Sequence, residues 1–446
     1  MNLFLKGSLL LAGAAFISEC LEFLINLTLT KELGEYGIGQ YMSIVPVMAM
    51  TAIIASMELP ISIAKFIAEK NEAYHLTLLK YATKLALLII FLLTAGMALI
   101  FIVFPLFQEI HPFIRWSILI LIPVISTSSI ARGYFMGVQK MGQIAAANLL
   151  RRCVHLFALV FLFQLFHFRL EIAILAAVCS LIGGELFVLI YLFSAYVLQL
   201  KYLKKRPAVP MEKSELAKSL LKVSVPTTMM RIFHSVTQAV RPFLIKYILV
   251  TGGMTAEEAT ESFGMIAGVA MTIGFFPAFI AHSLMTALIP NVSDAYAKRD
   301  QEQLFRLLKQ VIALTSLYGI PVTFFFYYFS GQLTGLFLDN HQAGYYLQIM
   351  LPFFLLHYFS IPFQAFLIGM NMVKDAFLHD IWATTASFVI MFILGSNSKF
   401  LVDGVIVGMN LGAVLLMLLH YLTICKKIGI SPFLYRKGKI IISVRD

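Results

Sequence analysis

The chain is dominated by apolar runs that are each long enough to cross a lipid bilayer as a helix. A spanning helix needs about 20 mostly apolar residues. Of the 446 residues, 60% are hydrophobic and only 13% are charged, whereas soluble domains carry about 25% charged residues. We therefore predict an all-α polytopic membrane protein with about twelve transmembrane helices. The runs are 7–30, 42–62, 80–105, 114–137, 143–167, 172–198, 219–250, 262–290, 307–330, 344–369, 375–396 and 400–425.

Basic residues gather on alternate connections between these runs, which predicts the orientation, because cytoplasmic loops are enriched in lysine and arginine. With the N-terminus inside, the inner connections hold Lys65, Lys70, Lys80, Lys84, Arg132, Lys140, Arg151, Arg152, Lys298, Arg299, Arg306 and Lys309. Both termini are then expected to be cytoplasmic. The net charge of +11 is explained by anionic lipids at the cytoplasmic face, and no nucleic-acid partner is expected.

The sequence predicts two related halves. Residues 199–216, "QLKYLKKRPAVPMEKSEL", are the one long polar linker. They separate a six-helix bundle at 1–198 from a second at 217–425, which a basic cytoplasmic tail at 426–446 follows. In each half a proline, Pro60 or Pro290, is expected to end a span, and "LLK" follows it. The segments "GYFMGVQKMG" (133–142) and "FLIGMNMVKD" (366–375) repeat the same pattern, a glycine closing a span before a short basic loop.

The offset of about 230 residues between these landmarks predicts a tandem repeat. Because each half has an even number of spans, the repeats run parallel and are related by pseudo-two-fold symmetry along the membrane normal. Such a plan predicts a central cavity between the bundles that opens alternately to the two sides, which is typical of transporters.

Two acids near the start lie where a membrane helix is expected. Glu19, Glu22, Asn26 and Thr30 follow one another at helical spacing and so share one face. A charged residue at bilayer depth must meet a cavity or a partner. We predict that this face lines the cavity, with Glu19 and Glu22 as coupling or ion-pairing residues and Asn26 as a substrate contact. Structural ion pairing is the alternative.

A second polar stripe begins the other half. It comprises Thr227, Arg231, His234, Gln238 and Arg241, spaced by four, three, four and three residues. Arginine offers a fork of donors that suits phosphate or pyrophosphate, so Arg231, His234, Gln238 and Arg241 are predicted to bind substrate. In the alternative interpretation, Arg231 or Arg241 neutralises Glu19 or Glu22.

Other polar residues within spans are weaker candidates for the cavity: Glu185, His282, His357 and Gln364. Arg151 and Arg152 are predicted to be interfacial anchors. Asp375, His379 and Asp380 are predicted to form a solvated helix start, because acids favour N-terminal turns. The four cysteines show no metal-ligand spacing, so no metal site is expected.

Several segments resemble a known superfamily. They are "FLKGSLLL" at the start, "ELGEYGIGQY" (32–41), "ELPISIAKFIAE" (58–69) and "ARGYFMGVQKMGQIAAANLLRR" (131–152). They are similar to the multidrug/oligosaccharidyl-lipid/polysaccharide (MOP) exporter superfamily, in its stage V sporulation protein B-like polysaccharide-flippase branch. This resemblance implies two six-helix bundles, as in MATE-like transporters, a sporulation or cell-wall role, and a lipid-linked saccharide as cargo. Flippase relatives commonly carry arginine in the first span, where this chain has Glu19 and Glu22.

Three functions are weighed. The first is a flippase for a lipid-linked saccharide, such as a cell-wall, spore cortex or polysaccharide precursor. The second is a drug or small-molecule exporter of the same fold that is coupled to H⁺ or Na⁺, which the acidic first span favours. The third, a membrane enzyme, is not expected, because the external loops are short and no Gly-rich nucleotide loop is present. We expect a monomer without a cofactor, apart from the coupling ion.

Overall fold

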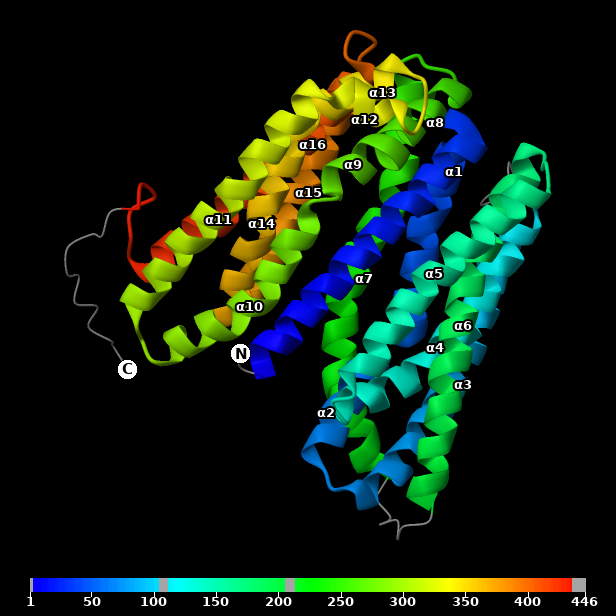
Figure 1. Ribbon diagram of the computed structural model, residues 1–446, viewed down its shortest axis with the longest axis vertical. Coiled ribbons are helices and arrows are strands. Elements are labelled where there is room, and N and C mark those ends of the chain that lie inside the picture. Colours follow the sequence, from blue (N-terminus) through cyan, green and yellow to red (C-terminus); the bar gives the residue numbers. More distant parts are fainter. Residues whose placement is uncertain (1–2, 104–110, 205–212, 435–446) are drawn as a thin grey trace. The chain divides into compact units, whose positions relative to one another are not determined.

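The computed structural model describes residues 3–103, 111–204 and 213–434 of the chain, and almost all of that part is helical. It forms two compact units, Met1–Phe243 and Leu244–Asp446 (Figure 1). The boundary between the units lies inside one helix. The domain limits expected from the sequence stay a prediction, although residues 199–204 continue a helix rather than begin a linker.

The first unit is built from seven helices. They are α1 (Leu3–Ser56), α2 (Leu59–Glu69), α3 (Glu72–Val103), α4 (Phe113–Gly137), α5 (Met141–Leu165), α6 (Leu170–Lys204) and α7 (Lys213–Thr251), the last of which continues into the second unit. At Gly34, α1 is kinked, with a φ of 66° and a ψ of −174°. Only glycine reaches that part of backbone space without strain. The predicted spans 7–30 and 42–62 therefore lie on one continuous element that Gly34 divides.

The second span ends earlier than predicted. Met57 and Glu58 both have positive φ, 42° and 49°, and this break separates α1 from α2. Pro60 then lies in the first turn of α2, where its missing N–H would have no helical partner. Pro60 thus begins a helix instead of ending one. The prediction for Pro290 is also wrong, because Pro290 lies inside a helix of the second unit.

The second unit contains a broken helix followed by long helices and the two short helices α12 and α13. It comprises α8 (Ala256–Gly264), the π-helical turn η1 (Met265–Ala270), α9 (Met271–Phe275), α10 (Ala278–Ala297), α11 (Gln301–Tyr328), α12 (Ser330–Gly335), α13 (His341–Ile349), α14 (Leu351–Gly369), α15 (Val373–Gly395) and α16 (Leu401–Ile428). The segment Ala256–Phe275 meets Ala278–Ala297 at 54°. Pro277 lies at this bend, where it removes a backbone donor. The hydroxyl of Tyr358 donates to the carbonyl of Gly274 beside it.

The number of spans agrees with about twelve. In the described part of the chain, nine helices are long and apolar enough to cross a membrane, and the bent pair at Pro277 gives a tenth. That count takes the segment Phe16–Glu69 as one helix, although Gly34 divides it into two. The 39-residue α7 has the length of a further span.

The helices α4 and α14 end in the same turn, a common helix ending that also follows α10 at Lys298, Arg299 and Asp300. After α4, the N–H groups of Val138, Gln139 and Lys140 donate to the carbonyls four, three and five residues earlier, and Gln139 has a φ of 58°. After α14, Met370, Asn371 and Met372 repeat the same three bonds, and Asn371 has a φ of 60°.

The glycine that ends each of these helices packs in the same way. A Cβ at Gly137 would meet the side chain of Ile67 and the carbonyl of Ala64. A Cβ at Gly369 would meet the side chain of Val292 and the carbonyl of Ile289. The tandem repeat predicted from the sequence is therefore confirmed at the level of local structure.

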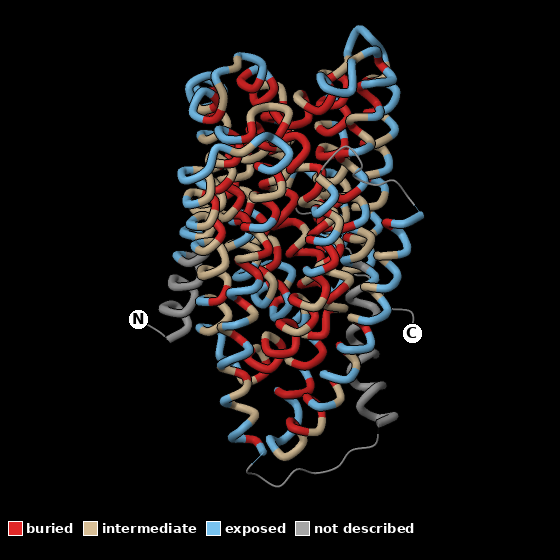
Figure 2. Tube along the Cα trace, turned by 90° about the vertical axis from the view of Figure 1, so that its right-hand side faces the viewer, coloured by how far each residue is buried: buried red, intermediate tan, exposed pale blue. Residues whose placement is uncertain are grey.

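Packing separates inward from outward faces, as Figure 2 shows. On α3 the outward face is apolar: Leu87, Phe91 and Ile102 are 60%, 70% and 81% exposed. Such a long exposed apolar face is unfavourable in water and suits contact with lipid.

Small residues bring α15 and α16 close together. Gly404, Gly408 and Gly412 recur every fourth residue on α16, and a Cβ on any of them would lie 2.4–2.7 Å from atoms of α15. Small residues at this spacing let membrane helices approach closely. The stripe therefore fixes the face that α16 presents to α15.

Candidate functional site

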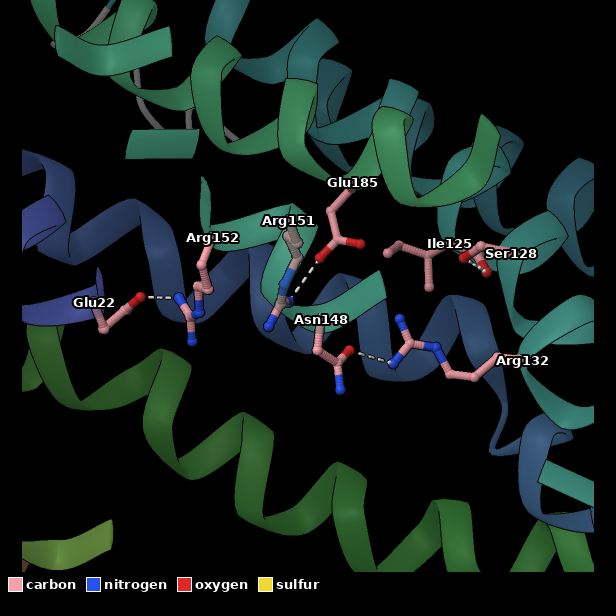
Figure 3. Close-up of polar contacts among 8 residues, drawn as sticks. All are labelled: Glu22, Ile125, Ser128, Arg132, Asn148, Arg151, Arg152 and Glu185. Atoms are coloured by element: carbon pink, nitrogen blue, oxygen red, sulfur yellow. Dashed lines mark hydrogen bonds and ion pairs between the residues drawn. The ribbon is translucent and has the colours of Figure 1, made fainter. Parts of the chain in front are cut away.

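The two adjacent arginines of α5 are directed at different neighbouring helices. Consecutive helical residues point about 100° apart, and α5 packs between α6 and α1. Arg151 pairs with Glu185 of α6, with 2.8 Å between Nη1 and Oε1. Arg152 pairs with Glu22 of α1. One pair of residues therefore links three helices, as Figure 3 shows.

A glycine allows the first of these pairs to form. A Cβ at Gly184 would lie 2.9 Å from the backbone carbonyl of Arg151, so α5 and α6 approach at this point more closely than a larger residue permits. Glu185 follows immediately, and its side chain is only 10% exposed. The close approach thus places the acid against the arginine.

A third arginine joins the same region from α4. The Nη1 of Arg132 donates to the Oδ1 of Asn148, at 3.1 Å (Figure 3). Asn148 lies one turn before Arg151 and Arg152 on α5, so its side chain shares that part of the helix. Arg132, Arg151 and Arg152, with Glu22, Glu185 and Asn148, are called the arginine cluster below.

The two α5 arginines of the cluster lie at membrane depth. Arg151 comes ten residues after the start of the 25-residue α5, about 15 Å along the helix and so near the middle of the membrane. The prediction that Arg151 and Arg152 are interfacial anchors is therefore wrong. Their partners are acids on neighbouring helices rather than lipid headgroups.

The predicted acidic stripe contributes to this cluster. Glu22 is the partner of Arg152, and Glu19, one turn earlier, also interacts electrostatically with Arg152. Glu19, Glu22 and Asn26 are all half-buried. The structure thus supplies an arginine for the first helix, from α5 rather than from α7 as the alternative interpretation supposed.

The second predicted stripe meets a different acid. On α7, the Nη1 of Arg231 lies 2.6 Å from the Oε1 of Glu58. Glu58 is the residue at the break between α1 and α2, and its side chain is 6% exposed, against 57% for Arg231. An arginine of α7 therefore binds the acid that stands at the strained end of α1.

The rest of that stripe has a mixed environment. His234 is exposed, whereas Gln238 and Arg241 are half-buried. The Nε of Arg241 is buried and makes no hydrogen bond within the described part of the chain. Its guanidinium is therefore a donor with unused capacity. Substrate binding by these residues stays a prediction.

The four weaker candidates for the cavity do not lie together in the structure. Glu185 belongs to the arginine cluster. His357 packs among aromatic rings, 5.0 Å from the ring of Phe275, which favours a structural role. Gln364 is half-buried on α14, and His282 is exposed on α10.

His379 does not belong to a solvated helix start. Its Nδ1 lies 2.9 Å from the Nδ1 of His420 on α16, and His420 is fully buried. The prediction of a solvated start is therefore wrong for this residue. Of the residues that the structure describes, no group of three or more histidines, cysteines or acids could hold a metal ion.

Sequence reasoning missed Glu58, Arg132 and the pairing role of Arg151 and Arg152. The signal was available, because Arg132 and both α5 arginines fall inside the predicted spans 114–137 and 143–167. The rule that made Glu19 a candidate, that a charge within a span needs a partner, applies equally to them. Because these arginines were assigned to the basic inner connections that set the orientation, their need for a partner within the membrane was overlooked.

The sequence also matches known proteins. Residues 4–296, well over half of the chain, match the family described as polysaccharide biosynthesis protein. The chain belongs to this family. Residues 266–379 match a second family, MatE. The resemblance to the MOP superfamily is therefore confirmed.

Two curated relatives come from Bacillus subtilis (strain 168). The chain is 46% identical to sporulation protein YkvU over 97% of its own length and 98% of the relative. It is 28% identical to stage V sporulation protein B, over 96% of its own length and 85% of the relative. The match to both thus extends through the two halves.

Solved structures show the same fold. An inward-facing multidrug resistance MATE family transporter of the MOP superfamily aligns with a TM-score of 0.72 at 17% identity, over 92% of this chain and 94% of that one. A MOP superfamily transporter from Pyrococcus furiosus aligns with a TM-score of 0.63 at 16% identity, over 95% and 96%. Family and fold together make the chain a multi-pass bacterial membrane transporter and point away from an enzyme.

Proposed function

We propose that the chain flips a lipid-linked saccharide across the cytoplasmic membrane and that the arginine cluster binds the anionic linkage of this cargo. The observation that carries the proposal is the gathering of three arginines on α4 and α5, of which the two on α5 lie at membrane depth. Family membership and the sporulation relatives support a cell-wall, spore cortex or polysaccharide precursor.

The charges of the cluster are balanced only in part. Glu22 and Glu185 pair with Arg152 and Arg151, whereas Arg132 binds the neutral amide of Asn148. A guanidinium binds phosphate oxygens through two parallel hydrogen bonds. A phosphate or pyrophosphate can therefore bind Arg132 first and then compete with the two acids for Arg151 and Arg152.

Partial exposure makes this exchange feasible. The side chains of Arg151 and Arg152 are 34% and 28% exposed, so a ligand can reach them without dismantling the helix packing. The acids keep the arginines paired while cargo is absent, which avoids an uncompensated charge at membrane depth. Arg231 and Arg241 on α7, with His234, Gln238 and Asn26, are proposed as further contacts for the saccharide linkage.

Substitution of Arg152 tests this proposal. Arg152→Ala in a deletion strain is expected to lose complementation and to accumulate the lipid-linked precursor, measured in membrane extracts. Because the single change leaves Glu22 unpaired, Arg152→Ala/Glu22→Gln serves as the charge-balanced variant and should fail equally. Lys65→Ala, which removes a 55%-exposed side chain from an exposed pair with Glu69, should complement fully.

Normal precursor levels in the charge-balanced variant, at wild-type protein abundance, would contradict the proposal. The same result for Arg151→Ala/Glu185→Gln would exclude the cluster as a whole.

A second function is favoured by a specific observation. The match to MatE covers 266–379, and the first helix carries acids instead of arginine. We infer as the alternative an H⁺- or Na⁺-coupled drug exporter in which Glu19 and Glu22 bind the ion. Glu19→Gln and Glu22→Gln should then raise drug sensitivity in an exporter-deficient host. A pH and Na⁺ dependence of export that does not change in these variants would count against it.

A further inference from the structure

We propose that His379 and His420 form a proton-binding site between α15 and α16. Their Nδ1 atoms lie 2.9 Å apart, which is a hydrogen-bond distance. The two rings stand 5.1 Å apart between centroids. The pair is remote in sequence, so only the packing of two helices brings the rings together. The inference holds whichever cargo the chain carries.

The hydrogen bonds leave room for one added proton. The Oγ1 of Thr423 lies 3.3 Å from the Nε2 of His379, whereas the Nε2 of His420 is buried and has no partner within the described residues. In the neutral pair one Nδ1–H donates to the other Nδ1. If His420 donates, its own Nε2 is the unprotonated nitrogen; if His379 donates, that nitrogen is the Nε2 of His379. In both tautomers the pair accepts one proton without breaking the central bond.

The surroundings explain why the pair is suited to protons rather than to a metal. Burial disfavours a positive charge on His379, and Asp375, one turn earlier on α15, offsets part of that effect. Asp380 follows His379 directly in the sequence. A hydrogen-bonded pair of nitrogens leaves no space for an ion between them, and no third ligand gathers in the described residues.

Helices packed against the pair carry further titratable groups. On α16, Tyr421 and Cys425 flank His420; α14, which packs against both helices, carries His357 and Tyr358. The helix α11, which shares a core cluster with the end of α16, carries Arg306 and Lys309. Of these groups, His357 is used as a control substitution below.

The glycine stripe makes the site sensitive to helix position. His420 is directed at α15, as Gly404, Gly408 and Gly412 are, because its ring contacts His379 of that helix. The close backbone packing at the stripe holds the rings in register. A proton on the pair adds a charge between these helices, where burial makes it costly. Proton binding therefore favours any arrangement of α15 and α16 that admits water to the rings.

The site lies within reach of one membrane surface. His379 is six residues after the start of α15, and His420 is eight residues before the end of α16. The pair therefore lies about 10 Å from the start of α15 and from the end of α16. A proton can thus enter from that side.

Tryptophan fluorescence tests the inference in purified protein, without cargo. The chain has two tryptophans, and Trp382 lies three residues after His379, on the neighbouring face of α15. In a Trp116→Phe background, Trp382 is the single reporter, and a protonated imidazole quenches indole emission. Because burial disfavours the added proton, we expect a one-proton sigmoidal loss of emission as the pH of the nanodisc sample falls below about 6.5. His379→Gln and His420→Gln should each abolish that transition.

Matched variants separate this site from its neighbours. Asp380→Asn and His357→Gln should keep the transition, because neither residue belongs to the pair. A flat profile in the Trp116→Phe background would overturn the inference. So would a transition that survives in either glutamine variant, or one that disappears in Asp380→Asn.

Size-exclusion profiles establish that each variant is folded, and the two glutamine variants test the site independently. The Arg152 experiment and this titration use different residues and different readouts. Failure of the flippase proposal therefore leaves the titration interpretable.

Discussion

The two units of the chain handle polar groups inside the membrane in opposite ways. In the first unit, arginines are paired with Glu22, Glu185 and Glu58 on neighbouring helices. In the second unit, the ion pair of Lys298 with Asp294 lies at the exposed end of α10. Among the described residues of this unit, the buried polar side chains are hydroxyls, such as that of Ser360, and the imidazole of His420.

The difference suits the two units to different roles on a repeated helical scaffold. Fixed charges suit the recognition of an anionic ligand, because arginine stays protonated at any physiological pH. Histidines suit a change of protonation, since their charge varies near neutral pH. The same helical repeat can therefore carry a ligand site in one copy and an ion-sensitive site in the other.

The largest expected effect comes from breaking an ion pair in the first unit. Glu185→Leu leaves Arg151 without its acid in a largely buried place and should lower the free energy of unfolding by about 3 kcal/mol. Thermal unfolding in detergent measures the change.

The double variant Arg151→Met/Glu185→Leu sharpens this test, because replacing both charges by apolar groups removes the uncompensated charge. It should recover most of the lost stability. Equal instability of the single and double variants would mean that the pair is not what stabilises α5 against α6.

The second unit should respond instead to the size of its small residues. Gly408→Ala places a Cβ 2.7 Å from the backbone nitrogen of Met391, so α15 and α16 must separate, at a cost of about 2 kcal/mol. The control is Gly183→Ala, whose Cβ meets nothing within 4 Å and which should be neutral or slightly stabilising in a helix. Equal melting temperatures for the two variants would refute the close packing.

A smaller effect is expected at the bend near Pro277. Tyr358→Phe removes the hydroxyl that donates to Gly274 but keeps the buried ring, and should cost about 1 kcal/mol. Thermal unfolding again provides the measurement, with Tyr421→Phe as a comparison, since the hydroxyl of Tyr421 binds Pro432 in an exposed place. A loss for Tyr358→Phe no greater than that for Tyr421→Phe would show that the bend does not need this bond.

Much of the fold follows from the sequence, because apolar runs of spanning length are dictated by the thickness of the bilayer. The predicted span 114–137 differs by one residue from α4, Phe113–Gly137. The errors arise at prolines. Pro60 and Pro290 look alike in the sequence, but the break in the first unit comes from Met57 and Glu58, and the bend in the second comes at Pro277.

The candidate site was only partly predictable. Periodicity shows which residues share a face of one helix, so Glu19 and Glu22 could be recognised as a pair. It does not show which other helix that face meets. The partners of Glu22, Glu58 and His379 are 130, 173 and 41 residues away along the chain, and they are set by packing that no local pattern encodes.

The matching turns after α4 and α14 have an experimental consequence. Gln139 and Asn371 occupy the same left-handed position in two otherwise different surroundings, as do Gly137 and Gly369 at the helix ends. A change made in one copy therefore has an internal reference in the other, within the same molecule and the same membrane. A difference in stability or activity between the two variants would then come from residues in which the two halves have diverged.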